Sequence, residues 1–269
     1  MPSIGNVSGV PRRALHIFYV LDTSGSMAMS GNEEGTKISV LNRAMENCIE
    51  ALKEFADKNA DAELKIAVLE FSSGCKWVTF NGPESLEDFE WESLEAGGQT
   101  DFGVALRELN AKLSPDQYLA SITGAYRPII IFMTDGYPTD DYERELESIK
   151  TNKFFSKGVK IGFVIGEDAD EKMITSVVGN PEAVIRTNDL ALFSKLLVKV
   201  SVTSSMIATK PTMNNDAGEE AVRLANDQTG GNSYKQESDI RDVTDDAPIF
   251  TNVEAPDNDP TKGWDVEDW

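Results

Sequence analysis

Three stretches of this chain carry neighbouring hydroxyl and carboxylate side chains, and two of them lie at the ends of apolar runs. The first is Asp22-Thr23-Ser24-Gly25-Ser26, which follows the apolar residues 17–21. Such a run is typical of a buried strand, and open α/β sheets bind ligands at the carboxyl ends of their strands. Hydroxyl and carboxylate oxygens are also the donors that small divalent cations prefer. One loop supplies only part of a coordination shell, so further oxygens are needed.

Two later stretches supply such oxygens. Gly98-Gln99-Thr100-Asp101 precedes a predicted helix, and Thr134-Asp135-Gly136 follows the apolar run 128–133. Because parallel strands end at one edge of a sheet, we expect these loops to lie together. The sequence therefore predicts one site for a cation, with Mg²⁺ expected and Mn²⁺ or Ca²⁺ as alternatives. The predicted ligands are Asp22, Ser24, Ser26, Thr100 and Asp135.

The elements that position these loops follow from hydrophobic periodicity. Apolar runs predict strands near residues 16–21, 64–71, 76–80, 128–133, 159–165 and 184–185. Apolar residues spaced three or four apart predict helices near 36–60, 104–113, 140–149, 170–177 and 189–206. Alternation of strands and helices indicates an α/β, Rossmann-like fold. It has a mainly parallel central sheet, one short antiparallel edge strand, and helices on both faces.

The net charge narrows the class of partner, and the cysteine content narrows the cellular location. The chain has 269 residues and a formal net charge of −21, which argues against nucleic acid and anionic membranes as partners. We also expect no membrane span and no signal peptide. The two cysteines, Cys48 and Cys75, suggest no disulfide framework, so a cytoplasmic location is expected.

The order of the site residues resembles the metal-ion-dependent adhesion site of von Willebrand factor A domains. The resemblance spans about residues 14–207 and rests on Asp22-Thr23-Ser24-Gly25-Ser26-Met27, Thr100 and Asp135. It implies that Ser24 and Ser26 bind the cation directly, and that Thr100 does so in the ligand-competent state. It implies that Asp22 and Asp135 act through waters or hydrogen bonds. It also implies one coordination position left for a carboxylate of a protein partner.

The resemblance also suggests how the chain is divided. Residues 1–13 are expected to be a loose leader, 14–207 the von Willebrand factor A domain, and 208–269 an acidic, disordered tail. Within that tail, residues 219–225 could form one short helix. A tail acid such as Glu219 or Glu267 could also occupy the open metal position.

Simpler roles for the same residues remain open. Asp22 or Ser24 could cap the helix after the first loop, and Thr100 or Asp101 could cap the helix at 104. Asp135-Gly136 could be an ordinary turn. Three acids near the predicted rim of the site are expected to be solvated charges: Asp101, Asp140 and Asp141.

Catalytic alternatives fit the sequence less well. The spacing of Gly25 and Gly31 does not match a phosphate-binding loop, and no lysine follows in the required place. The single histidine, His16, begins a strand, and Ser24 follows the opposite end of that strand, which disfavours a Ser-His-Asp arrangement. Cys48 falls on or beside the apolar stripe of its helix. We therefore expect a binding module rather than an enzyme.

Among von Willebrand factor A proteins, this acidic, cysteine-poor chain is most similar to bacterial cytoplasmic proteins related to the tellurium-resistance protein TerY. That similarity implies an adaptor that works with a Ser/Thr kinase or a PP2C-type phosphatase. The alternative is an interaction or phospho-substrate protein recognised through its acidic tail, with a structural or self-occupied metal site. Ser and Thr residues at the end of the last long helix, such as Thr203, could then receive phosphate.

Overall fold

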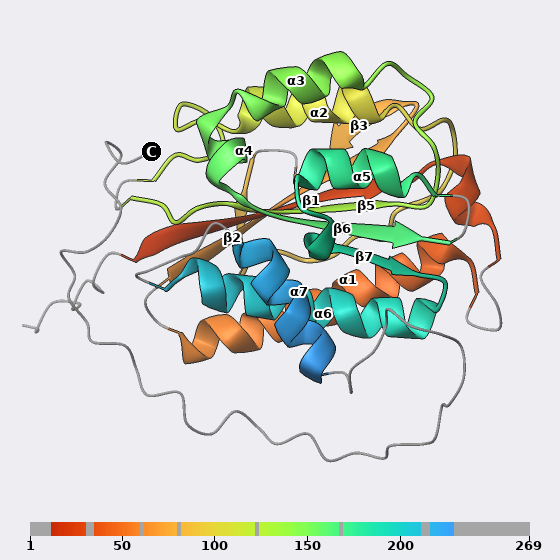
Figure 1. The fold of residues 1–269 in the computed structure, drawn as a ribbon. Coiled ribbons are helices and arrows are strands. Elements are labelled where there is room, and N and C mark those ends of the chain that lie inside the picture. The colour runs from red at the N-terminus through yellow and green to blue at the C-terminus, as the bar shows by residue number, and fades with distance from the viewer. Residues whose placement is uncertain are drawn as a thin grey trace, which may run out of the picture.

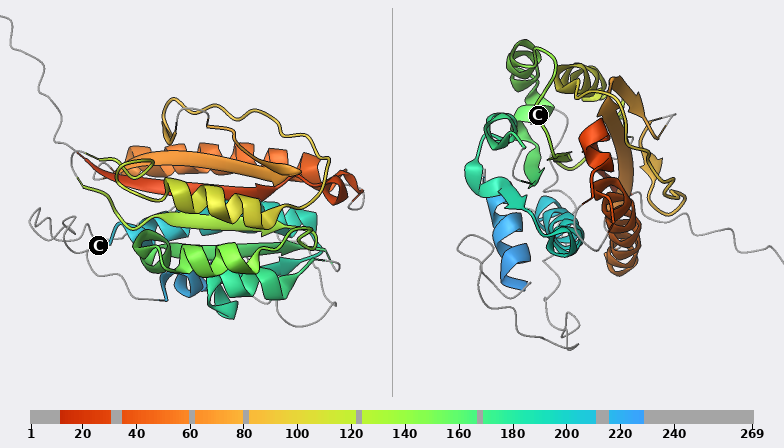
Figure 2. Two further views of the ribbon diagram at one scale, coloured as in Figure 1. Left: turned by 90° about the horizontal axis from the view of Figure 1, so that it is seen from above. Right: turned by 90° about the vertical axis from the view of Figure 1, so that its right-hand side faces the viewer.

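A central sheet lies between two layers of helices (Figure 1). The computed structural model describes residues 12–30, 35–59, 62–79, 82–121, 124–166, 169–210 and 216–228. Helices α1, α6 and α7 cover one face, and α2, α3, α4 and α5 cover the other, as both views in Figure 2 also show. Each face has its own apolar cluster, so the sheet is buried on both sides. The predicted leader lies almost wholly outside the described residues.

The sheet is mainly parallel, as predicted. Its strands follow the order β3-β2-β1-β5-β6-β7, with β2 pairing parallel to β1, and β1, β5, β6 and β7 pairing parallel in succession. Strand β3 is the expected antiparallel edge strand, and the two-residue β4 also pairs antiparallel with β2. The strands are β1 (Arg13–Asp22), β2 (Ala62–Ser72), β3 (Gly74–Trp77), β4 (Glu84–Ser85), β5 (Ile129–Thr134), β6 (Val159–Ile165) and β7 (Val184–Thr187).

Several helices are preceded by a residue whose side chain accepts hydrogen bonds from backbone N–H groups of the first turn. Thr36 does so for α1, Asn152 for α4, Asp170 for α5 and Asp189 for α6, which satisfies backbone donors that lack helical partners. The helices are α1 (Lys37–Lys58), α2 (Phe102–Lys112), α3 (Glu143–Lys150), α4 (Lys153–Lys157), α5 (Glu171–Val178), α6 (Leu190–Ala208) and α7 (Ala217–Gln228). Short 3₁₀ turns are η1 (Gly25–Ala28) and η3 (Pro181–Ala183).

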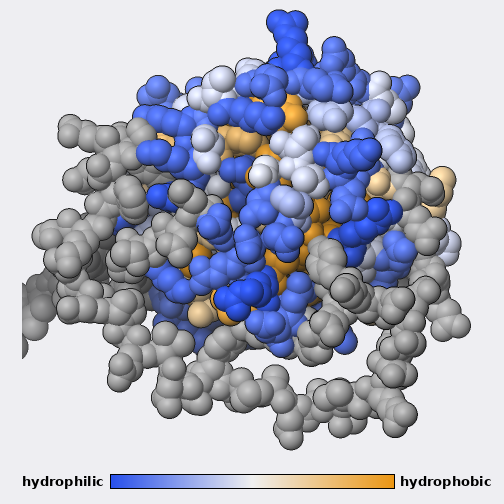
Figure 3. Space-filling model, in the orientation of Figure 1, coloured by the Kyte–Doolittle hydropathy of each residue, from blue (hydrophilic) through white to orange (hydrophobic). Residues whose placement is uncertain are grey.

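Helix α6 is long and apolar, whereas the sequence predicts no stretch long and apolar enough to span a membrane. By length and composition alone α6 passes that test. However, Phe193, Leu196, Leu197 and Val200 are fully buried in the cluster that α6 shares with α1. Its apolar character is therefore explained by packing inside the domain. The outer surface in the view of Figure 3 is mostly hydrophilic, with smaller hydrophobic areas between charged side chains.

Helix α7 differs from the expected disordered tail beyond residue 207. The short helix expected at 219–225 is present, is longer, and packs against α6 and β6. Ala221 and Ala225 are fully buried, and Thr203 Oγ1 in α6 donates a hydrogen bond to the Ala221 carbonyl at 3.2 Å. A Cβ added to Gly218 would lie 2.5 Å from the Lys160 carbonyl oxygen, so glycine permits this close approach. Residues 211–215 and 229–269 of the predicted tail lie outside the described part of the chain.

Candidate metal centre

Asp22 is fixed at the carboxyl end of the central strand β1. Strand β5 runs beside β1 in parallel, so Thr134 at the end of β5 lies next to Asp22. Thr134 Oγ1 donates to Asp22 Oδ2 at 2.6 Å, and the Ser24 backbone N–H donates to Oδ1 at 2.8 Å. Asp22 is fully buried, and burial raises the pKa of its carboxyl group although these hydrogen bonds lower it. A nearby cation would favour the charged carboxylate.

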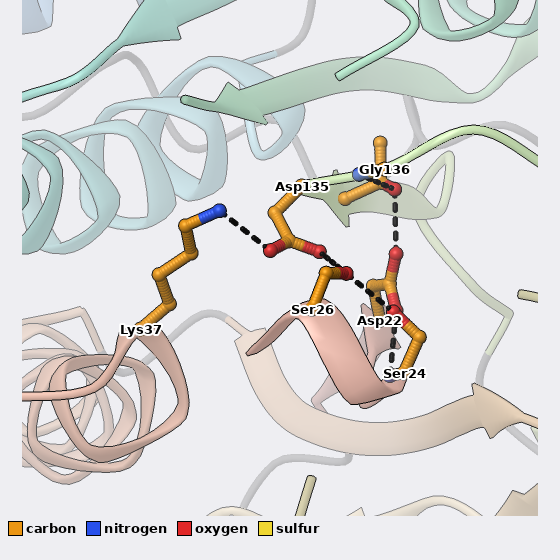
Figure 4. A network of polar contacts seen from close by, with 7 residues as sticks. Asp22, Ser24, Ser26, Lys37, Asp135 and Gly136 are labelled. Carbon is orange, nitrogen blue, oxygen red and sulfur yellow. Dashed lines mark hydrogen bonds and ion pairs between the residues drawn. The ribbon is translucent and has the colours of Figure 1, made fainter. Parts of the chain in front are cut away.

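The two serines of the first loop connect to Asp135 on the neighbouring loop (Figure 4). Ser24 Oγ and Ser26 Oγ lie 3.0 Å apart, and Ser26 Oγ donates to Asp135 Oδ1 at 2.6 Å. The first loop forms the 3₁₀ turn η1, which points Ser24 and Ser26 to the same side. Two uncharged hydroxyls and a carboxylate therefore form one continuous network.

The loop that carries Thr100 is held against the first loop by its backbone. Gly97 N–H donates to the Thr23 carbonyl at 2.8 Å, and Gly25 N–H donates to the Gly98 carbonyl at 3.1 Å. Thr100 itself is buried, with 6% of its surface exposed. The three predicted loops thus meet at one edge of the sheet.

Gly136 shows that the donor oxygens face a shared space. A Cβ added to Gly136 would lie 3.5 Å from Ser26 Oγ and 3.9 Å from Thr100 Oγ1, so hydroxyls from two loops face a position that carries no side chain. The donor set consists of hydroxyl and carboxylate oxygens, which fits a hard cation such as Mg²⁺. Within the described residues, no cluster of three or more His, Cys, Asp or Glu side chains could hold a metal. The hydroxyls are therefore essential to a cation site here.

The structure brings the predicted residues together, and cation binding by them stays a prediction. Asp22, Ser24, Ser26 and Asp135 belong to one hydrogen-bonded network, and Thr100 lies beside it across Gly136. Sequence reasoning missed Thr134 as the partner of Asp22, although its position directly before Asp135 was a usable signal.

Sequence reasoning also missed Lys37, the first residue of α1. Lys37 Nζ donates to Asp135 Oδ2 at 2.7 Å, while Ser26 Oγ donates to Asp135 Oδ1. The side chain of Asp135 is fully buried and that of Lys37 is 17% exposed. A lysine in the first turn of a helix opposes the helix dipole, which was the available sequence signal for a nearby carboxylate.

The capping roles considered for the site residues are filled by other side chains. Thr36 Oγ1 accepts from Ser39 N–H at the start of α1. At the start of α2, Asp140 accepts from the Gly103 and Val104 N–H groups at 2.9 and 3.0 Å. The expectation that Asp140 is a solvated charge was therefore wrong, because its carboxylate caps α2 from another loop.

Asp101 is likewise more than a solvated charge. Its Oδ2 accepts from the Gly74 N–H at 2.7 Å, which ties the loop that carries Thr100 to the β2–β3 turn. Its side chain makes no capping hydrogen bond at α2. Asp141 is exposed, as expected.

His16 and Cys48 lie apart from this network. His16 is buried on β1 with neither ring nitrogen hydrogen-bonded, and burial, with a smaller effect from Lys65, lowers its pKa to about 3. Cys48 is buried on α1 with its Sγ 3.1 Å from the Tyr19 hydroxyl, and burial raises the pKa of its thiol. Both Cys48 and Cys75 are free thiols.

Comparison with known proteins agrees with this geometry. The family described as von Willebrand factor type A domain matches residues 17–138, which include every predicted site residue. No curated protein matches the chain. The fold is the Rossmann-like α/β fold of von Willebrand factor A domains.

Solved structures share the fold at low sequence identity. Proximal thread matrix protein 1 from the mussel byssus, "with zinc occupied MIDAS motif", has a TM-score of 0.55 and 17% identity over 72% of this chain and 48% of its own. The pilus adhesin SpaC from Lactobacillus rhamnosus GG has a TM-score of 0.53 and 14% identity, covering 72% of this chain and 31% of its own. The ArnB paralog VWA2 from Sulfolobus acidocaldarius has a TM-score of 0.50 and 20% identity, covering 71% of this chain and 46% of its own. This chain spans less than half the length of each.

Proposed function

We propose that this domain, which has the von Willebrand factor A fold, is a protein-binding adaptor that holds a partner's Asp or Glu carboxylate through a bound divalent cation. The observation that carries the proposal is the network joining Asp22, Ser24, Ser26 and Asp135 at one sheet edge, with Thr100 across Gly136. All its donors are oxygens, and three of them are neutral hydroxyls.

Each residue has a distinct role in this proposal. The bound cation would supply an electrophilic position for one carboxylate oxygen. Ser24, Ser26 and Thr100 would contact the cation through neutral oxygens, which leaves more of its charge for the partner. Asp22 and Asp135 would act at longer range, because each already accepts two hydrogen bonds that hold its carboxylate in place.

We propose Mg²⁺ as the cation, with Mn²⁺ and Ca²⁺ as alternatives that share its preference for oxygen. We further propose a bacterial, cytoplasmic, TerY-like system in which the partner is a Ser/Thr kinase or a PP2C-type phosphatase. Support comes from the resemblance in sequence, the strongly acidic charge and the two free thiols.

Affinity capture tests the proposal directly. The full-length chain is immobilised, and capture is compared in Mg²⁺, in a chelator, and after Mg²⁺ is restored. We expect partner capture to be lost in chelator and regained with Mg²⁺, while circular dichroism shows that the domain remains folded. Capture that is equal in chelator would refute the proposal.

Matched variants assign the effect to the site. The double variant Ser26→Ala with Thr100→Ala removes two hydroxyls without removing a buried carboxylate, so we expect it to lose both Mg²⁺ binding and capture. Ser156→Ala is the control, because Ser156 is an exposed serine of α4.

A chain ending at Gln228 tests the acidic tail. Lost capture with unchanged Mg²⁺ binding in that chain would favour recognition through the tail.

A further inference from the structure

Lys37 places a positive charge in direct contact with the predicted cation site. Its Nζ lies 2.7 Å from Asp135 Oδ2, and Ser26 Oγ lies 2.6 Å from Asp135 Oδ1 (Figure 4). One carboxylate thus joins the ammonium of α1 to a hydroxyl that would contact the cation. A charge placed this close acts on anything bound at the network.

Local structure keeps the ammonium in this place. Lys37 begins α1 directly after the capping residue Thr36, where the helix dipole disfavours a cation. The buried carboxylate of Asp135 compensates for that unfavourable position. Gly166, after β6, has a φ of +92°, and a Cβ there would lie 3.3 Å from Lys37 Nζ. The absence of a side chain at Gly166 therefore leaves room for the ammonium.

The formal charges of the side chains indicate how Lys37 changes the net charge of the cation-loaded site. Asp22 and Asp135 alone would neutralise a divalent cation, and Lys37 leaves the loaded site with one positive charge in excess. We propose that Lys37 is a charge-setting residue that weakens cation binding and, in return, strengthens the capture of a single carboxylate by the loaded site. This inference rests on the proposed function, because it concerns the same cation and the same carboxylate.

A purely structural ion pair would behave differently. If Lys37 only stabilised the fold, its replacement would leave cation affinity unchanged or reduce it through local disorder. The charge-setting role predicts opposite changes in two affinities, with tighter cation binding and looser carboxylate binding. A structural defect does not produce that combination.

Mn²⁺ alone is the first probe, because free Mn²⁺ is counted by electron paramagnetic resonance. Chelator-treated full-length wild type, Lys37→Met, Lys37→Gln and Lys37→Arg are titrated. Met and Gln remove the charge, Gln keeps a hydrogen-bond donor, and Arg keeps the charge. We expect the neutral variants to bind Mn²⁺ about tenfold more tightly or better. Arg should resemble the wild type. If Met does not fold, Gln carries the comparison.

Acetate is the second probe, titrated into the Mn²⁺-loaded proteins and followed by water-proton relaxation at the bound ion. We expect the neutral variants to require at least about threefold more acetate. Equal or weaker Mn²⁺ binding by the neutral variants, or unchanged acetate binding, would overturn the role of Lys37 alone. Absence of Mn²⁺ binding to the wild type would instead overturn the metal site and the proposed function with it.

Discussion

The buried histidine of β1 should make this protein sensitive to mild acid. His16 is 1% exposed, neither ring nitrogen is hydrogen-bonded, and burial lowers its pKa to about 3. In the unfolded chain its pKa is about 6.5. Because the unfolded chain binds the proton more readily, the neutral histidine contributes stability above about pH 6.5. That contribution is lost progressively as the pH falls toward about 3.

The size of the effect follows from the two pKa values. Between about pH 7 and about pH 5, the free energy of unfolding should fall by about 2 kcal/mol on account of His16. For a domain of this size that corresponds to a fall in Tm of about 4–8 °C. The assay is thermal unfolding of the wild type and His16→Leu at both pH values in the presence of a chelator.

The His16→Leu variant isolates the contribution of this one residue. Leucine cannot be protonated, so we expect its Tm to change less than the wild type over the same pH range. The raised pKa of Asp22 acts in the opposite direction, because the folded state then gains protons first, but that effect is common to both proteins. Equal losses of Tm in the wild type and His16→Leu would refute the reasoning.

Two further predictions concern the rim of the site and the last helix. Met29 and Tyr137 are each 62% exposed on the loops that carry Ser26 and Asp135, so Met29→Ser and Tyr137→Ser should each weaken partner capture by about tenfold. Their Mg²⁺ affinity and Tm should stay unchanged, and a lower Tm would instead indicate a structural role. A chain ending at 210 should lose about 2 kcal/mol relative to one ending at 228, because α7 buries apolar side chains on α6 and β6. Equal urea midpoints for the two chains would contradict this.

The sequence predicted that Asp22 and Asp135 would meet at one edge of the sheet because each lies at the end of a strand. Asp22 comes directly after the apolar run 17–21, and Asp135 comes one residue after the run 128–133. Parallel pairing brings the ends of such runs together whatever the details of packing. The antiparallel edge strand was predicted on a different ground, because a hairpin-like turn at Ser72-Ser73-Gly74 separates the apolar runs 64–71 and 76–80. These features depend on local pattern and on general rules of topology, so a single sequence was sufficient.

The missed features depend on surfaces that exist only in the folded domain. The direction of the Lys37 side chain depends on where α1 begins and on the space left beside Gly166. A short helix was expected at 219–225 but its docking was not, because α7 buries mainly alanines, whose small apolar area gives a weak signal in an acidic segment. Its docking also needs close contact between Gly218 and the backbone of β6. Neither arrangement is visible in hydrophobic periodicity.

The hydrogen bonds around Asp22 and Asp135 have a consequence for how ions are distinguished. Both carboxylates are anchored to the two central parallel strands or their loops, and each accepts two hydrogen bonds. An ion entering such a frame meets donors with little freedom to move, so little conformational entropy is lost on binding. A rigid frame also cannot widen easily for a larger ion. Mg²⁺ and Ca²⁺ carry the same charge, so if the proposed site binds a cation, ionic radius would be the property that separates the two ions.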